Sequence, residues 1–139
     1  MKKKQNDGYV LDTFAFLAYY YEEVGTDVIE KLLNQAQEKK ISLYISEINL
    51  GEIYYIILRD KGEEVAGSTL TNLLKLPVEI ISTNLTLVLT AARYKSRGRI
   101  SYADCFVLAV AQEKKAQIVT GDPEFEPFED EFPIIWLQG

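Results

Sequence analysis

The segment Tyr9-Val10-Leu11-Asp12-Thr13 is a short apolar run that ends in an acid and a hydroxyl residue. Its length suits a buried β-strand better than a helix, because helices usually need about ten residues or more and strands only a few. The residues that follow, 13–21, stay apolar without strict alternation, as in a short helix packed on a sheet. The segment therefore predicts a strand that opens an α/β unit, with Asp12 at its carboxyl end.

Strand-like and helix-like stretches alternate outward from this segment. They are recognised from short apolar or β-branched runs, from apolar residues at helical spacing, and from capping and turn residues between them. The predicted strands are 9–11, 41–45, 78–81, 117–120 and 134–136, and the predicted helices are 13–21, 26–39, 46–61, 63–76, 84–95 and 101–115. An acidic loop is expected before the last strand. This order predicts an α/β fold in which helices cover both faces of a parallel sheet.

Length and composition limit the class of protein. A chain of 139 residues is near the usual size of one domain, so we expect a single domain over 1–139, with 1–8 as a flexible N-terminal tail. No apolar run approaches the roughly 20 residues that a membrane span requires. The single cysteine, Cys105, cannot form an internal disulfide or a zinc cage. We therefore expect a cytoplasmic protein without a membrane partner.

The chain contains no histidine. This excludes Ser-His-Asp and Cys-His nucleophile systems, the ribonuclease mechanism that uses two histidines, and histidine-rich metal sites. Any catalysis must depend on carboxylates, hydroxyls, amines or a hard cation. The net charge of -6 opposes non-specific binding to a polyanion, so a nucleic-acid substrate would need local positive charge or a bound cation.

Four acids are expected around one crevice. In open parallel sheets, ligands bind beyond the carboxyl ends of the strands, where the strand order reverses. Asp12 directly follows the first strand, and Asp122 follows the fourth by one glycine. Asp104 lies in the first turn of the helix before the fourth strand, and Glu52 lies within the helix after the second. The four carboxylates could therefore reach the same edge of the sheet.

Each acid also has an ordinary structural explanation. Asp12 could be a simple N-cap, Asp104 stands in a Ser-x-x-Asp pattern that resembles a capping box, and Asp122 lies in a Gly-Asp-Pro turn. Glu52 on an apolar helix is harder to explain in this way, because burying an unpaired carboxylate is unfavourable. For any one position the alternatives stay open, and only the four together form a joint signal.

Four stretches of the chain, in order, are similar to the successive motifs of PIN-domain proteins. They are 10–13 (VLDT), 49–54 (NLGEIY), 101–109 (SYADCFVLA) and 118–125 (IVTGDPEF). The VapC-type toxin nucleases of toxin-antitoxin systems are the most similar, and the resemblance covers about 9–136. It implies a three-layer α/β/α fold with a parallel sheet of four to five strands in the order 3-2-1-4-5. Phe14 departs from the pattern, because a small polar residue often follows the first motif there.

The resemblance also implies a function and its residues. Asp12, Glu52, Asp104 and Asp122 would be both the catalytic and the metal-binding acids, with Thr120 and Thr13 in support. The cofactor would be Mg²⁺ or Mn²⁺, as one or two ions, which suits oxygen ligands. A metal-activated water would hydrolyse RNA to products with 5'-phosphate and 3'-hydroxyl ends. A VapB-like antitoxin and a second copy of the chain are the expected protein partners.

Two surface features have less specific interpretations. Arg97 and Arg99 lie in a basic segment before the helix that carries Asp104, and they either steer RNA phosphates or only decorate a helix end. The aromatic residues are expected to serve the core and a partner surface rather than base stacking. They are Phe14, Phe16, Tyr19, Tyr20, Tyr21, Tyr54 and Tyr55. The alternative function is a PIN-fold module that binds RNA or protein without cutting.

Overall fold

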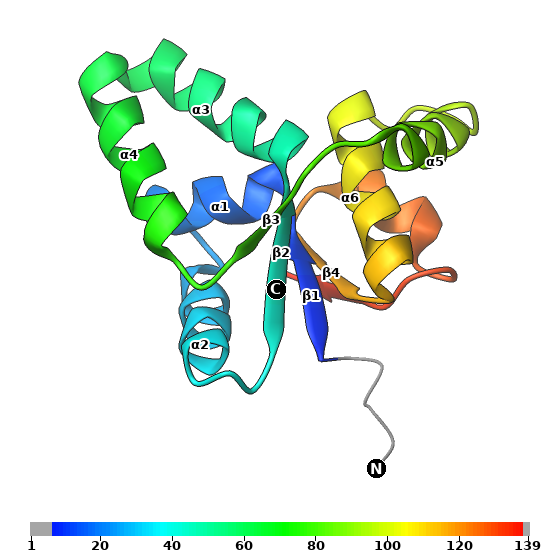
Figure 1. Cartoon of the computed structure of the whole chain (residues 1–139), viewed down its shortest axis with the longest axis horizontal. Helices are drawn as coiled ribbons and strands as arrows, with labels where there is room; N and C mark the ends of the chain where they lie inside the picture. The colour runs from blue at the N-terminus through cyan, green and yellow to red at the C-terminus, as the bar shows by residue number, and fades with distance from the viewer. Residues whose placement is uncertain (1–6, 138–139) are drawn as a thin grey trace.

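The computed structural model describes residues 7–137, in which five strands alternate with helices (Figure 1). The strands are β1 (Gly8–Leu11), β2 (Ser42–Ser46), β3 (Glu79–Ile81), β4 (Gln117–Thr120) and β5 (Ile134–Trp136). The α-helices are α1 (Thr13–Tyr20), α2 (Thr26–Gln37), α3 (Glu47–Lys61), α4 (Glu63–Lys75), α5 (Leu85–Lys95) and α6 (Tyr102–Lys114). A short 3₁₀ helix, η1 (Pro123–Phe128), lies between β4 and β5.

All five strands are parallel and lie in the order β3-β2-β1-β4-β5, which confirms the predicted fold class and strand order. β1 is the central strand, and Val10 pairs with Tyr44 on one side and with Ile118 on the other. Figure 1 shows α1 to α4 on one side of the sheet and α5 and α6 on the other. The sheet is therefore covered on both faces.

Alternating residues of the central strands supply two separate cores. Val10 and Ile118 pack with α5, α6 and η1 in one core, whereas Leu11 and Val119 pack with α1 to α4 in the other. Each of these four residues is fully buried, because its side chain meets a helical layer on whichever face of the sheet it lies. This explains why the strands are continuous apolar runs rather than alternating ones.

The structure corrects two details of the sequence prediction. The expected acidic loop after Asp122 is not all loop, because Pro123–Phe128 form η1. Of the expected tail 1–8, residues 1–6 lie outside the described residues, but Gly8 is the first residue of β1. The carbonyl of Asp7 also accepts a hydrogen bond of 2.8 Å from the Ser42 amide, so the prediction of a tail through residue 8 is too long. None of the helices found in 7–137 is long and apolar enough to cross a membrane.

Candidate metal centre

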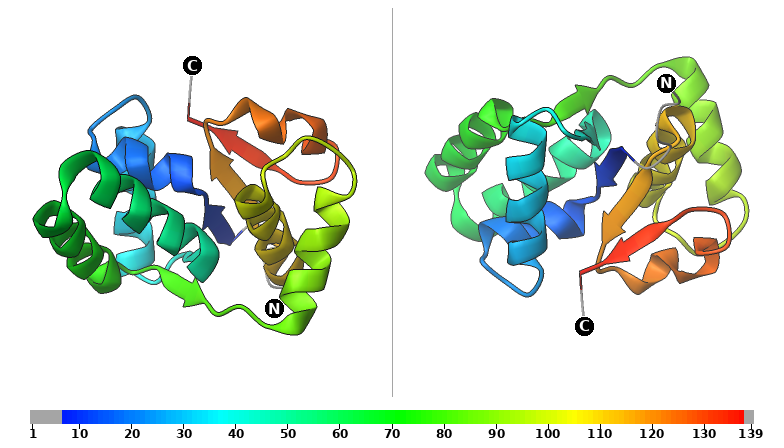
Figure 2. Two further views of the ribbon diagram at one scale, coloured as in Figure 1. Left: turned by 90° about the horizontal axis from the view of Figure 1, so that it is seen from above. Right: turned by 90° about the horizontal axis from the view of Figure 1, so that it is seen from below.

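The carboxyl ends of β1 and β4 lie side by side at the point where the sheet reverses its order. The strand that follows β1 in sequence, β2, lies on one side of this pair, and the strand that follows β4, β5, lies on the other. Figure 2 shows this edge from above, with α3 and α6 on opposite sides of it. Asp12 directly follows β1, and Asp122 follows β4 after Gly121. Both acids therefore reach the edge where an open α/β sheet binds its ligands.

Asp12 is held by both of its carboxylate oxygens. Oδ1 accepts the Ala15 amide at 2.8 Å, which makes Asp12 the N-cap of α1, and Oδ2 accepts the hydroxyl of Thr120. Only 1% of the Asp12 surface is exposed. The loss of solvation raises the pKa of Asp12 from 3.8 to about 7, although the Thr120 hydrogen bond lowers it. Asp12 is thus both the N-cap of α1 and a buried acid at the carboxyl end of β1.

Thr120 connects the two strand ends. Its hydroxyl accepts the Asp122 amide at 2.9 Å and donates to Asp12. Because a hydroxyl has a single proton, accepting from the amide leaves that proton for the Asp12 carboxylate. Thr120 is fully buried at the end of β4, so this arrangement is shielded from water. The side chain accordingly holds Asp12 and Asp122 at a common edge.

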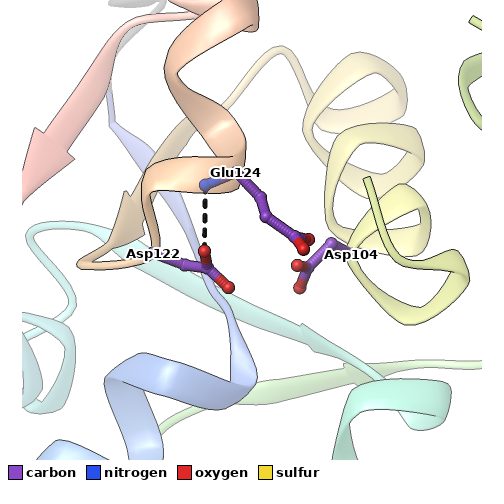
Figure 3. Close-up of side chains that lie close together, drawn as sticks. All are labelled: Asp104, Asp122 and Glu124. Carbon is purple, nitrogen blue, oxygen red and sulfur yellow. Dashed lines mark hydrogen bonds between the residues drawn. The ribbon is translucent and has the colours of Figure 1, made fainter. Parts of the chain in front are cut away.

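Three acids from different segments meet in front of this edge (Figure 3). Asp104, Asp122 and Glu124 each offer a carboxylate oxygen, and these three atoms lie within 4.8 Å of one another. Asp122 caps η1 by accepting the Glu124 amide at 2.9 Å, so its predicted turn role and its place in the cluster coexist. Oxygen atoms at this spacing are the donor set that a hard divalent cation prefers.

Asp104 carries the clearest electrostatic signature of the cluster. It lies in the first turn of α6, where Ser101 caps the helix and accepts the Asp104 amide at 3.1 Å. Only 7% of the Asp104 surface is exposed. Burial raises the pKa of Asp104, the charge of Asp12 raises it further, and so does a hydrogen bond to Glu124. No ion pair between residues 7 and 137 includes these acids.

Glu124 is the site residue that the sequence analysis missed. Its Oε1 accepts the Ser101 amide at 3.1 Å, which ties η1 to the start of α6. A signal was present in the sequence, because Asp122-Pro123-Glu124 has the cap, the first-turn proline and the first-turn acid of a helix start. The two aromatic residues that follow set the rotation of η1 and thereby the direction of the Glu124 side chain. Phe125 and Phe128 lie three positions apart and are buried on one face of η1.

Glu52 lies apart from this cluster. It is half-buried on α3, and its Oε1 accepts the Thr13 hydroxyl at 2.6 Å. Its charge still acts on Asp12, whose pKa it helps to raise. The structure thus brings Asp104 and Asp122 together with Glu124, whereas Asp12 is bound by Thr120 and Glu52 by Thr13. The role of the predicted quartet as ligands stays a prediction.

Phe14 occupies the wall of the site next to Gly121. A Cβ atom added to Gly121 would lie 2.3 Å from Cε1 of the Phe14 ring. Such a contact is impossible, so Phe14 can pack there only because residue 121 is glycine. The bulky ring at this unusual position is therefore accommodated by the backbone between Thr120 and Asp122.

Arg97 and Arg99 differ in their surroundings. The Arg97 guanidinium makes two hydrogen bonds to Glu131, of 3.1 and 2.5 Å, and lies 5.2 Å from the centre of the Phe128 ring. Its charge is thus already engaged within the chain. Arg99 is exposed, and no ion pair in 7–137 includes it. Both line a groove of about 410 Å³ that also includes Glu124. Arg99 is the more available of the two for a ligand.

The aromatic residues expected in the core and on a partner surface are divided between buried and exposed positions. Phe16 is fully buried, and Tyr19 and Tyr20 pack edge to face with ring centres 5.0 Å apart. Tyr54 and Tyr55 on α3 are exposed by 37% and 52%.

Comparisons with known proteins identify a family and a fold for most of the chain. A sequence profile described as the PIN domain matches residues 9–130. No curated protein is significantly similar in sequence. A chain of the Rickettsia felis VapBC2 structure, bound to a promoter DNA fragment, is 20% identical with a TM-score of 0.72, covering 94% of this chain and 99% of that one.

Two further solved structures are similar over most of their length. Mycobacterium tuberculosis VapC20, described as a toxin that cleaves the sarcin-ricin loop, is 20% identical with a TM-score of 0.67, covering 89% of this chain and 95% of that one. DNA-bound VapBC from Salmonella typhimurium is 12% identical with a TM-score of 0.72, covering 94% and 98%. At these identities the likeness shows a common fold.

Proposed function

The chain belongs to the PIN-domain family, and from this premise we propose that it is a metal-dependent endoribonuclease, a VapC-type toxin that hydrolyses RNA phosphodiester bonds. The observation that carries the proposal is the meeting of Asp104, Asp122 and Glu124 beside buried Asp12. No ion pair among the described residues 7–137 includes these acids, so a bound cation would relieve their mutual repulsion. The oxygen donors fit one or two ions of Mg²⁺ or Mn²⁺.

The residues divide the work of hydrolysis between them. When bound, the cation would supply Lewis acidity toward the phosphate and lower the pKa of water. Asp12, Asp104, Asp122 and Glu124 would hold it, with Thr120 fixing the orientation of Asp12. Glu52, oriented by Thr13 through Oε1, accepts the proton of the attacking water on its other oxygen. The products then carry 5'-phosphate and 3'-hydroxyl ends.

RNA reaches the site in this proposal despite the acidic chain. A bound cation offsets part of the local negative charge, and Arg99 adds an available cation on the groove that also includes Glu124. Arg97 acts instead by holding that wall of the groove against Glu131 and Phe128. Of the two predicted RNA-binding arginines, Arg99 is therefore proposed to contact a phosphate and Arg97 to position the wall.

A VapB-like antitoxin is the proposed protein partner, together with a second copy of the chain as a homodimer in the cytoplasm. The similarity to chains of VapBC complexes supports such a partner. A groove of about 970 Å³ between α4 and the turn from α1 to α2 supports it further. Its acids favour a basic segment in the partner. They are Glu22, Glu23, Asp27 and Glu30.

The experiment that tests this function is cleavage of end-labelled single-stranded RNA by the purified protein in Mg²⁺, in Mn²⁺ and in EDTA. The Asp12→Asn variant, purified in parallel, reveals any contaminating nuclease. We expect cutting that needs the metal and is lost in the variant. If neither protein cuts but Mn²⁺ raises the melting temperature, the substrate is restricted; if both effects are absent, the chain is a PIN-fold module that binds without cutting.

Glu124→Gln is expected to weaken Mn²⁺ binding by about 10-fold to 100-fold, because it removes a charged oxygen donor from the cluster. Isothermal titration calorimetry on the purified chain measures this. Glu126→Gln, two residues further along η1 and exposed, is the matched control and should bind Mn²⁺ as the unchanged protein does. Equal affinity in the two variants would remove Glu124 from the proposed site.

A further inference from the structure

Asn49 is a buried polar residue between the segments that carry the site acids. It is the third residue of α3, and none of its surface is exposed. A buried amide side chain is unfavourable unless its donors and its acceptor are hydrogen-bonded. The bonds that Asn49 makes therefore indicate which parts of the molecule it holds together.

Its side chain has a partner on each side. Oδ1 accepts the Ser46 hydroxyl at 2.5 Å, while Nδ2 donates to the Ala103 carbonyl at 3.2 Å and to the Thr13 hydroxyl at 3.3 Å. A carbonyl oxygen can only accept, so the amide nitrogen must face Ala103, and this fixes the orientation of the whole side chain. Both amide protons are then used.

The orientation of Asn49 determines that of the Thr13 hydroxyl. Thr13 has one proton, and since it accepts from Asn49 Nδ2, it donates that proton to Glu52 Oε1, 2.6 Å away. The same arrangement occurs at the other strand end, where the Asp122 amide donates to Thr120 and Thr120 donates to Asp12. On each side of the site, an N–H group orients a threonine, and the threonine orients a carboxylate.

Asn49 also reaches the opposite wall of the site. Ala103 immediately precedes Asp104 in the first turn of α6, so a bond to its carbonyl holds that turn against α3. One side chain therefore contacts three segments: its own helix, which carries Glu52; the start of α1, which follows Asp12; and the start of α6, which carries Asp104.

We propose that Asn49 is a positioning residue for the site, with one branch through Thr13 to Glu52 and a second through Ala103 to Asp104. The inference rests on the proposed nuclease function. Partners that orient catalytic or metal-binding groups typically contribute 10-fold to 100-fold to activity or metal affinity. The two branches have separate readouts, because Glu52 lies outside the cluster of Asp104, Asp122 and Glu124.

The test compares Asn49→Ala, Thr13→Val, their double variant and Thr13→Ser in three measurements. These are kcat and KM on single-stranded RNA, the Mn²⁺ dissociation constant from calorimetry, and the melting temperature of the metal-free protein. Asn84→Ala is the control, since it removes a side-chain bond to the Leu87 amide at the start of α5, away from the site. Asn49→Ser, too short to reach both partners, replaces Asn49→Ala if the latter does not fold.

The branches predict a specific pattern. Thr13→Val lowers kcat by about 10-fold to 100-fold and leaves Mn²⁺ affinity within about 3-fold, whereas Asn49→Ala lowers both. Thr13→Ser, which keeps the hydroxyl, restores kcat. Both single variants break the branch to Glu52. The double variant therefore has a kcat close to that of the less active single variant, and its loss in kcat is smaller than the product of the two single losses.

Other outcomes overturn the proposal in distinguishable ways. If Asn49→Ala loses only thermal stability, as Asn84→Ala does, Asn49 is a structural residue. Losses in kcat that multiply in the double variant mean that Asn49 and Thr13 act independently. If the unchanged protein neither cuts RNA nor binds Mn²⁺, the proposed function fails. If it binds Mn²⁺ without cutting the RNA used, an unaltered Mn²⁺ affinity in Asn49→Ala rejects the second branch.

Discussion

Asp104→Asn is expected to reduce RNA cleavage by at least about 1000-fold and, at the same time, to make the metal-free protein more stable. The loss in activity follows from removing a charged donor from the cluster with Asp122 and Glu124, and 1000-fold corresponds to about 4 kcal/mol of barrier. The gain in stability follows from the burial of Asp104, where an uncharged amide avoids the repulsion by Asp12.

Opposite effects on activity and stability separate a site residue from a structural one. Removing a structural group lowers both quantities, whereas a group kept for function at a cost to folding shows opposite signs. The gain should grow as the pH rises from about 4 toward 8, because the raised pKa makes the folded protein lose stability over this range and the amide of Asn does not titrate. Steady-state cleavage and urea unfolding in EDTA measure the two quantities. The control, Asp130→Asn on the exposed turn after η1, should change neither, and a destabilised Asp104→Asn would contradict the argument.

The metal-free protein is expected to become less stable as the pH rises from about 5 to 8. Burial raises the pKa of Asp12 from 3.8 to about 7, so between these values the folded chain keeps a proton that the unfolded chain has released. The stabilisation is complete below pH 3.8 and is lost as the pH rises through about 7. The shift corresponds to roughly 4 kcal/mol, or a fall in melting temperature of roughly 10 °C.

Divalent metal should reverse this trend. Mn²⁺ binds the deprotonated acids, and a concentration 100 times the dissociation constant adds about 2.7 kcal/mol to the stability. Melting curves from pH 5 to 8, with EDTA or with millimolar Mn²⁺, measure both effects. Asp12→Asn should make the curve in EDTA shallower, because it removes one of the two buried acids with a raised pKa, Asp12 and Asp104. A melting temperature in EDTA that rises over this range would reject the explanation.

Much of the fold was predictable because its signals are local. Asp12 is expected to end a strand because a three-residue apolar run precedes it, and each strand pattern is followed by helical spacing. A parallel arrangement then places all carboxyl ends at one edge, so Asp12 and Asp122 could be assigned to a common site without coordinates. The capping role of Asp12 and Asp122 does not exclude the proposed site role, since both residues cap a helix at the carboxyl edge of the sheet.

The details of the site depend on contacts between distant segments. Glu124 joins Asp104 only because Phe125 and Phe128 pack into the core and set the rotation of η1. Arg97 is engaged by Glu131, which lies 34 positions along the chain. No periodicity or spacing within either segment indicates such a partner.

The sequence by itself determined the order of strands and helices, the parallel sheet, and the two acids at the strand ends, because these follow from short-range patterns and from sheet geometry. Only the tertiary structure decided that Glu124 joins the cluster, that Glu52 lies beside Thr13, and that Asn49 connects Thr13 to α6. The physical reason is that a side chain's direction depends on what packs against its helix, and for Asn49 those neighbours come from segments 36 to 54 residues away.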